Sequence, residues 1–407
     1  MATIPRDKRL LFAAVFAAFF LFGVSNTIMG AALPRILDSY GWLDSQAGMV
    51  MASGSLAFFL ASFVAGRLVG RLGAGRTLAL GYGINVLGLA LFGTGPELVP
   101  NMLLYALIGV GQGFIEVAAN WAVLRMAGGE SSGKALSLVH GAYAIGAVTG
   151  PLMTGALLAS GISWQTGFRA SAVMFGILFV SALVLPFRSL GTEDKAAGSG
   201  KARSLASRPA YWLGALSLLL YVGAEHGLSN WSAELFDRIL LAPAAVAALV
   251  PSIFWLGLLA GRLGIPAIFP RTKPQRTLVF LGVGMVASYG MLALSAFLGP
   301  QARPLAWLAI ALAGLSSSAV YPMVVSIVAY ALPDRQGEAT GFAATGGGLG
   351  GFAFPLTMAT VSTVAGLSVG FSIYAAVAVM ALVSHKFLIG AAEREHAGRS
   401  HALSEAR

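Results

Sequence analysis

Long runs of apolar residues, separated by short polar segments, repeat along the whole chain. A helix needs about 20 mainly apolar residues to cross a bilayer, and the runs have this length. The sequence therefore predicts an all-α membrane protein with twelve transmembrane helices. They cover residues 9–33, 46–69, 76–95, 99–125, 134–160, 165–187, 209–236, 243–268, 276–299, 304–331, 337–365 and 367–390.

A polar stretch, Arg188 to Pro209, is rich in Gly, Ser, Ala and Lys and divides this series into two sets of six. Similar segments recur in both sets: "AGRLVGRLGAGRTLALG" follows the second run and "AGRLGIPAIFPRTKPQRTLVFLG" follows the eighth. Chance similarity between glycine-rich helices would give the same pattern, but duplicated six-helix bundles are how many transporters are built. We therefore expect an N-terminal bundle (1–187), a cytoplasmic linker (188–208), a C-terminal bundle (209–390) and a cytoplasmic tail (391–407).

The composition excludes a soluble protein, because 57% of the residues are hydrophobic, 10% are charged and the mean hydropathy is +0.80. A net charge of +10 would suggest a nucleic-acid partner in a soluble chain, but here it reports topology. If both termini share one face, that face collects all of the 26 Lys and Arg residues except Arg35, Arg169, Arg238 and Arg303. This bias predicts a multi-pass protein of a bacterial-type inner membrane with both termini in the cytoplasm, and no nucleic-acid partner.

Two of the 16 acidic residues are predicted to lie deep in the bilayer. Glu116 precedes the cytoplasmic end of its helix by about 14 Å, and Glu225 lies about 24 Å from the cytoplasmic side. An ionised carboxylate at such a depth costs several kcal/mol and is usually retained for a function. We expect Glu116 and Glu225 to couple transport to protons, although a protonated acid bonded to a neighbouring helix would explain either position.

Polar and aromatic residues near these acids are candidate substrate ligands. Asn120 follows Glu116 by one helical turn, so it could bind the acid or a substrate hydroxyl. The stretch "YVGAEHGLSNW" surrounds Glu225, although Glu225 and His226 could simply neutralise each other. The further candidates are Tyr221, His226, Asn230 and Trp231 in this stretch, and Asn26 and Tyr321 elsewhere. For Asn85, His140 and Tyr143 we expect interhelical hydrogen bonds instead.

The segment "GRLVGRLGAGR", Gly66 to Arg76, resembles the loop signature between helices two and three of the major facilitator superfamily. It has Gly70 where the family usually has Asp, which weakens the charge relay that the resemblance implies. Arg67, Arg71 and Arg76 are therefore candidate gating residues that could contact helix ends and lipid phosphates, or serve only as topogenic charges.

Several further motifs are similar to the fucose/hexose permease branch of that superfamily, including "IEVAAN", "HGAYAIGAVTGP", "YVGAEHG", "GLSSSAVYP" and "GGGLGGFAFP". The resemblance implies proton-driven uptake of neutral sugars, with the acid and amide of the fourth helix at Glu116 and Asn120. Gly30 replaces the Asp that the fucose permease has in its first helix, and Trp121 replaces the usual Pro after Asn120. Trp121 could supply a stacking platform for a sugar ring or narrow the cavity.

Two other functions stay open at this point. "GAVTGPLMTG" partly resembles the fifth-helix signature of proton-coupled antiporters, which would make the chain an exporter of drugs or metabolites. A membrane receptor without transport would share the same composition. The sequence has no Walker-type phosphate loop, HExxH pair or nucleophile elbow, so we expect neither an enzyme nor a cofactor. The favoured prediction is a monomeric secondary transporter whose partners are a sugar-like solute, protons and membrane lipids.

Overall fold

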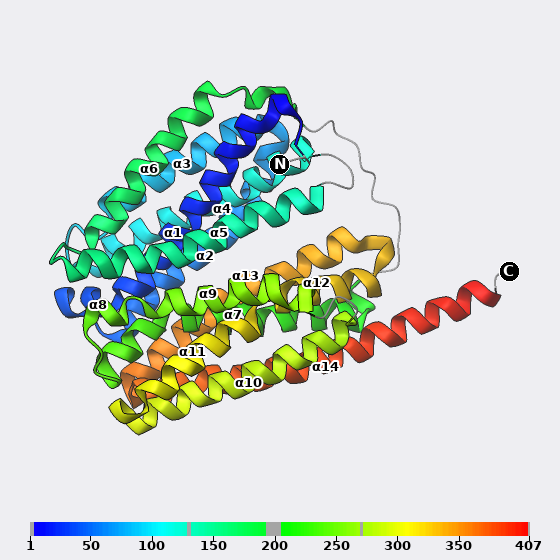
Figure 1. Cartoon of the computed structure of the whole chain (residues 1–407). Helices are drawn as coiled ribbons and strands as arrows, with labels where there is room; N and C mark the ends of the chain where they lie inside the picture. Colours follow the sequence, from blue (N-terminus) through cyan, green and yellow to red (C-terminus); the bar gives the residue numbers. More distant parts are fainter. Residues whose placement is uncertain (1–3, 128–131, 193–204, 269–271, 406–407) are drawn as a thin grey trace. The chain divides into compact units, whose positions relative to one another are not determined.

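The computed structural model describes residues 4–127, 132–192, 205–268 and 272–405, and these residues are almost entirely helical (Figure 1). Short 3-10 turns and one π-helical turn, Leu235–Ile239, join the longer elements. The helices are α1 (Arg9–Tyr40), α2 (Asp44–Leu72), α3 (Ala74–Leu91), α4 (Leu98–Ala127), α5 (Ser132–Ala159), α6 (Gln165–Val184), α7 (Pro209–Glu234), α8 (Ala244–Ala247), α9 (Val250–Ile268), α10 (Pro274–Leu298), α11 (Arg303–Ser317), α12 (Val320–Ala331), α13 (Gln336–Ala365) and α14 (Leu367–Glu405).

Every apolar run predicted from the sequence coincides with a helix or with two consecutive helices. The run 243–268 is divided into α8 and α9, and the run 304–331 is divided into α11 and α12. Within the described part of the chain, nine helical stretches are long and apolar enough to cross a membrane. The prediction of an all-α membrane protein is confirmed, and α14 continues past the predicted end of its span at residue 390.

Glycines in the left-handed region of backbone space end two of the helices. Gly41 follows α1 with a φ of 63°, and its N–H donates to the carbonyl of Leu37. Gly73 has a φ of 78° and separates α2 from α3, in the middle of the predicted loop signature. Side chains other than glycine pay a steric cost at such φ values, so both turns depend on glycine.

The helices group into two compact units. Unit 1 consists of residues 1–198, 232–238 and 242–255, and in it α1 packs against α5 while α4 packs against α2 and α3. Glycines bring these helices close together: a Cβ at Gly146 of α5 would overlap the carbonyl of Phe20 in α1, and one at Gly109 of α4 would overlap that of Gly54 in α2. The last residues of α7, together with α8 and the start of α9, belong to this unit.

Unit 2 consists of residues 199–231, 239–241 and 256–407. In it α10 packs against α11 and α14, and α13 packs against α14. Gly346 and Gly350 bring α13 against α7, where a Cβ would overlap the carbonyls of Ala215 and Leu219. Most of the predicted linker, residues 193–204, lies outside the described residues.

Candidate functional site

Glu116 lies half-buried on α4 in unit 1 and forms no hydrogen bond or ion pair with the described residues. One turn later, the buried side-chain oxygen of Asn120 also has no partner among them. One turn earlier, the buried Gln112 side chain donates to the Ser25 hydroxyl of α1 at 3.3 Å. Three polar side chains therefore follow one face of α4 at intervals of four residues. Buried polar atoms normally have a partner, so this face is suited to bind protons, water or a polar solute.

Gln112 and Ser25 were not identified from the sequence, although the interval of four residues between Gln112 and Glu116 is a usable signal. Asn26 was identified, and its side-chain nitrogen donates to the Tyr143 hydroxyl of α5 at 2.6 Å. This is the interhelical hydrogen bond expected for Tyr143. Asn85, by contrast, does not form the predicted bond within the described structure, because both of its buried side-chain polar atoms lack a partner there.

Trp121 is half-buried, and the Arg125 guanidinium lies over its ring with 4.8 Å between the guanidinium carbon and the ring centroid. A guanidinium at this distance is attracted to the ring face. The face that could stack on a sugar is therefore the one that Arg125 does not cover.

The second acid, Glu225, lies in unit 2, is 6% exposed and is surrounded by polar groups from three other helices. Tyr221 lies one turn earlier on α7, and its hydroxyl donates to the main-chain oxygen of Ser317 at the end of α11 at 2.8 Å. The positive charge of Arg262 on α9 acts on the Glu225 carboxyl group, and Glu225 in turn acts on Tyr289 of α10. Glu225 is therefore a buried acid in a polar environment, the polar cluster of unit 2.

The other candidates in unit 2 form no bond with Glu225 among the described residues. His226 forms no ion pair with Glu225 there, and its ring faces Gly351 of α13. Asn230 is half-buried. Trp231 is fully buried with its indole nitrogen unpaired. Tyr321, in the first turn of α12, is half-buried and has a partner.

The candidate gating residues Arg67, Arg71 and Arg76 lie exposed at the end of α2 and the start of α3, without a hydrogen bond or ion pair to the described residues. Their role stays a prediction. Within unit 1, their charge is available to solvent or to lipid phosphates.

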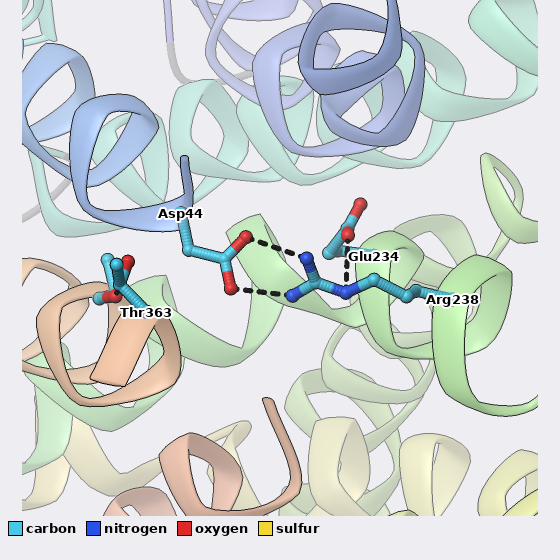
Figure 2. A network of polar contacts seen from close by, with 5 residues as sticks. Asp44, Glu234, Arg238 and Thr363 are labelled. Atoms are coloured by element: carbon cyan, nitrogen blue, oxygen red, sulfur yellow. Dashed lines mark hydrogen bonds and ion pairs between the residues drawn. The ribbon is translucent and has the colours of Figure 1, made fainter. Parts of the chain in front are cut away.

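A network that sequence reasoning missed joins Asp44, the first residue of α2, to Glu234 and Arg238 at the end of α7 (Figure 2). Two guanidinium nitrogens of Arg238 donate to the two Asp44 oxygens at 3.0 and 2.5 Å, and the Arg238 Nε lies 3.1 Å from a Glu234 oxygen. The acids are 5% and 4% exposed, and Arg238 is 43% exposed. Burial lowers the pKa of Arg238, but the bond to Asp44 and the charge of Glu234 outweigh it and raise this pKa. In the sequence, the spacing of four residues between Glu234 and Arg238 was the available signal for this ion pair.

A comparison with known families identifies the fold independently, because the sequence pattern described as Major Facilitator Superfamily matches residues 15–355. The chain belongs to this superfamily. It is therefore a multi-pass membrane protein of a transporter family, and not an enzyme. Its resemblance to the fucose/hexose permease branch, inferred above from the motifs, is consistent with the names of its relatives.

Three relatives illustrate the range of these names. A glucose/galactose transporter of Brucella abortus is 24% identical over 387 residues, which cover 90% of this chain and 92% of the relative. The L-fucose-proton symporter of Escherichia coli is 27% identical over 40% of this chain and 37% of the symporter. The enterobactin exporter EntS of Citrobacter koseri is 29% identical over 41% of this chain and 42% of the exporter.

Two solved structures support the fold. The nucleoside transporter NupG superposes with a TM-score of 0.78 at 15% identity and covers 94% of this chain and 100% of NupG. The transporter FucP in its outward conformation superposes with a TM-score of 0.63 at 19% identity and covers 94% of this chain and 99% of FucP. At these identities the likeness extends to the fold alone.

Proposed function

We propose that this superfamily member is a proton-coupled secondary transporter that takes up a neutral sugar or a similar small polar solute by alternating access. The Brucella relative, named as a glucose/galactose transporter, aligns over nine-tenths of the chain and supports a sugar-like substrate. The shorter match to an L-fucose-proton symporter supports proton coupling. The two six-helix bundles, residues 1–187 and 209–390, move against each other in a monomer whose termini are both in the cytoplasm of a bacterial cell. No ATP or cofactor is required.

The observation that carries this proposal is the polar face of α4. Glu116 is a carboxyl group on an apolar helix with no hydrogen-bond or ion-pair partner among the described residues, so a proton can reach it and leave it without breaking a protein contact. Asn120, whose side-chain oxygen has no partner among the described residues, can accept a hydrogen bond from a sugar hydroxyl. In this proposal Glu116 carries the coupled proton and Asn120 binds the solute.

The remaining candidates have secondary roles in the proposal. Glu225 is a second proton site in unit 2. Each unit has polar and aromatic candidates for solute binding, and the exposed arginines contribute to gating. The candidates for solute binding are Asn26 and Trp121 in unit 1, and Tyr221, His226, Asn230, Trp231 and Tyr321 in unit 2. The candidates for gating are Arg67, Arg71 and Arg76.

Transport by reconstituted protein tests the proposal. In proteoliposomes with an imposed inward proton gradient, we expect accumulation of D-glucose, D-galactose or L-fucose. Glu116→Gln keeps the size and hydrogen bonding of the side chain but removes its titration, so accumulation should stop while solute exchange without a gradient continues. Glu97→Gln, an exposed acid before α4, is the matched control and should accumulate normally. Accumulation that persists in Glu116→Gln but is lost in Glu225→Gln would assign coupling to Glu225.

A second candidate function is export. The match to an enterobactin exporter over 175 residues and the "GAVTGPLMTG" segment of α5 favour it. Under this alternative the vesicles would exchange protons for lipophilic compounds and would move none of the three sugars. A receptor would bind a solute without any flux, which the same vesicles measure.

A further inference from the structure

The predicted span 304–331 is broken between α11 and α12. The first helix ends at Ser317, and Ser318 and Ala319 form a turn before the second begins. In a continuous helix the Ser318 carbonyl would accept from the N–H four residues later, but that residue is Pro322, which has no N–H. The Ser318 carbonyl therefore lacks its helical backbone donor. A main-chain oxygen inside a membrane protein has to find another donor, because water is scarce there.

The guanidinium of Arg262 on α9 supplies this donor. Its Nε donates to the main-chain oxygen of Ser318 at 3.0 Å. Arg262 was counted from the sequence among the charges of the cytoplasmic face, but it lies within the apolar stretch Ala244–Ile265 and is half-buried. The preceding residue, Gly261, allows this close approach, because a Cβ there would overlap the Ser318 side chain. The break in the span therefore holds a positive charge among the helices of unit 2.

Two tyrosines bond the residue next to Ser318. The Tyr221 hydroxyl of α7 donates to the main-chain oxygen of Ser317 at 2.8 Å, and the Tyr289 hydroxyl of α10 lies 3.4 Å from the Ser317 hydroxyl. Both tyrosines and Ser317 are buried. Side chains from α7, α9 and α10 therefore converge on two consecutive residues at the end of α11.

The same three side chains interact with Glu225. The positive charge of Arg262 acts on its carboxyl group, which in turn acts on Tyr221 and Tyr289. Tyr374 of α14 interacts with Tyr289 and so belongs to the same surroundings. The ion pairs of the described residues do not include one between Glu225 and Arg262, so the guanidinium acts on the acid while it is bonded to the turn. The place of this charge relative to Glu225 therefore depends on the carbonyl that holds it.

We propose that Arg262 is a positioning residue for proton release from Glu225, and that the break at Pro322 holds it in place. This inference rests on the proposed function, in which Glu225 is a second proton site, and it leaves the neutral solute unchanged. The proton passes from the Glu225 carboxyl group to water, and the guanidinium keeps its own protons. A positive charge held near a buried acid stabilises the carboxylate that remains. The Ser318 carbonyl fixes the place of that charge, so both the charge and the break are needed for the full effect.

A double-mutant cycle between Glu225 and Arg262 tests the electrostatic part without any substrate. Intrinsic fluorescence during heating gives melting temperatures for the wild type, Glu225→Gln, Arg262→Gln and the double variant at about pH 5 and about pH 8. At the higher pH, Arg262→Gln should cost about 2–4 °C more in the wild type than in Glu225→Gln, because only a carboxylate loses its counter-charge. This excess should shrink in acid, where Glu225 is protonated. A purely structural role of Arg262 would give the same loss at both pH values.

Pro322→Ala tests the role of the break, because Ala restores the N–H that the Ser318 carbonyl lacks. Arg262→Gln should lower the melting temperature less in this background than in the wild type. Pro322→Ala should itself cost more in the wild type than in Glu225→Gln at the higher pH, although Arg262 is unchanged. This second cycle decides the question if Arg262→Gln folds poorly.

Two variants serve as controls for charge. Arg262→Lys keeps a positive charge and a donor, so it should not show the pH-dependent loss. Arg276→Gln removes an exposed arginine at the start of α10 and should be additive with Glu225→Gln at both pH values.

Transport in proteoliposomes connects the cycles to function. Arg262→Gln should slow proton-driven accumulation of the sugar about tenfold, because the proton leaves Glu225 less readily. Solute exchange without a gradient requires no proton release and should continue. A loss of accumulation and exchange together would indicate general damage to the protein and would contradict the positioning role.

Additive melting temperatures for Arg262→Gln and Glu225→Gln at both pH values would overturn the inference, as would an excess that does not change with pH. A loss in Arg262→Gln that Pro322→Ala leaves unchanged would overturn the role of the break. No flux of D-glucose, D-galactose or L-fucose would remove the proposed function, while the cycles would still decide whether Arg262 acts on Glu225. Flux together with additive cycles would keep the proposed function and remove the inference.

Discussion

Arg238→Gln tests the stability contributed by the charge network in Figure 2. Gln keeps one donor but removes the charge, so Asp44 and Glu234 remain buried without their counter-ion. Removal of one partner from a fully buried ion pair costs about 3–5 kcal/mol. The guanidinium is 43% exposed and water screens it, so we expect a smaller loss of about 2 kcal/mol. For a unit of this size, that corresponds to a fall in melting temperature of about 4–8 °C.

Intrinsic fluorescence during heating measures this change, because the chain contains seven Trp residues. Arg35→Gln is the matched control: Arg35 lies 3.7 Å from Asp38, but the two side chains are 48% and 66% exposed, so loss of this pair should be nearly neutral. Unfolding of a membrane protein is often irreversible, so the variants are compared at one heating rate. Equal melting temperatures for the two variants would refute the argument that burial of the acids makes the network strong.

Three other predictions concern packing, pH dependence and topology. Gly146→Ala should lower the melting temperature, at a cost of about 1–3 kcal/mol for overpacking, whereas Gly141→Ala, which has open space, should not. Burial raises the pKa of Asp237, so the folded state loses stability as pH rises above about 4; Asp237→Asn should raise the melting temperature at pH 7 but not in acid. Single cysteines at the exposed Ser189 and Pro300 of this Cys-free chain should label oppositely with an impermeant maleimide on intact cells, and labelling of Ser189 from outside would contradict the orientation.

Apolar run length was sufficient to predict where the helices lie, because backbone hydrogen bonding forces a spanning segment to be helical over its whole length. The interruption at Ser318 was not predicted. Pro322 has no N–H to donate to the Ser318 carbonyl four residues earlier, so the helix is broken at this point. Pro322 in "GLSSSAVYP" was the available signal.

The depth of a residue along its helix identified Glu116 and Glu225, but not the groups that surround Glu225. Depth follows from counting residues at 1.5 Å each, whereas contacts depend on which helices pack together. Tyr221 was a candidate because it lies beside Glu225 in sequence. Arg262 was missed because its partners come from α7 and the α11–α12 turn, far away in the chain.

The repeated Gly-Arg step shows how two similar segments acquire different chemistry. Gly66 and Arg67 lie near the end of the second predicted span, and Gly261 and Arg262 lie near the end of the eighth. Within its unit Gly66 has open space around it, and Arg67 is exposed. Gly261 packs directly against the Ser318 hydroxyl, which brings α9 close enough for Arg262 to bond the main chain at the turn. The same dipeptide therefore places one cation at the surface and the other inside a helical unit, and the packing of the preceding glycine decides between the two.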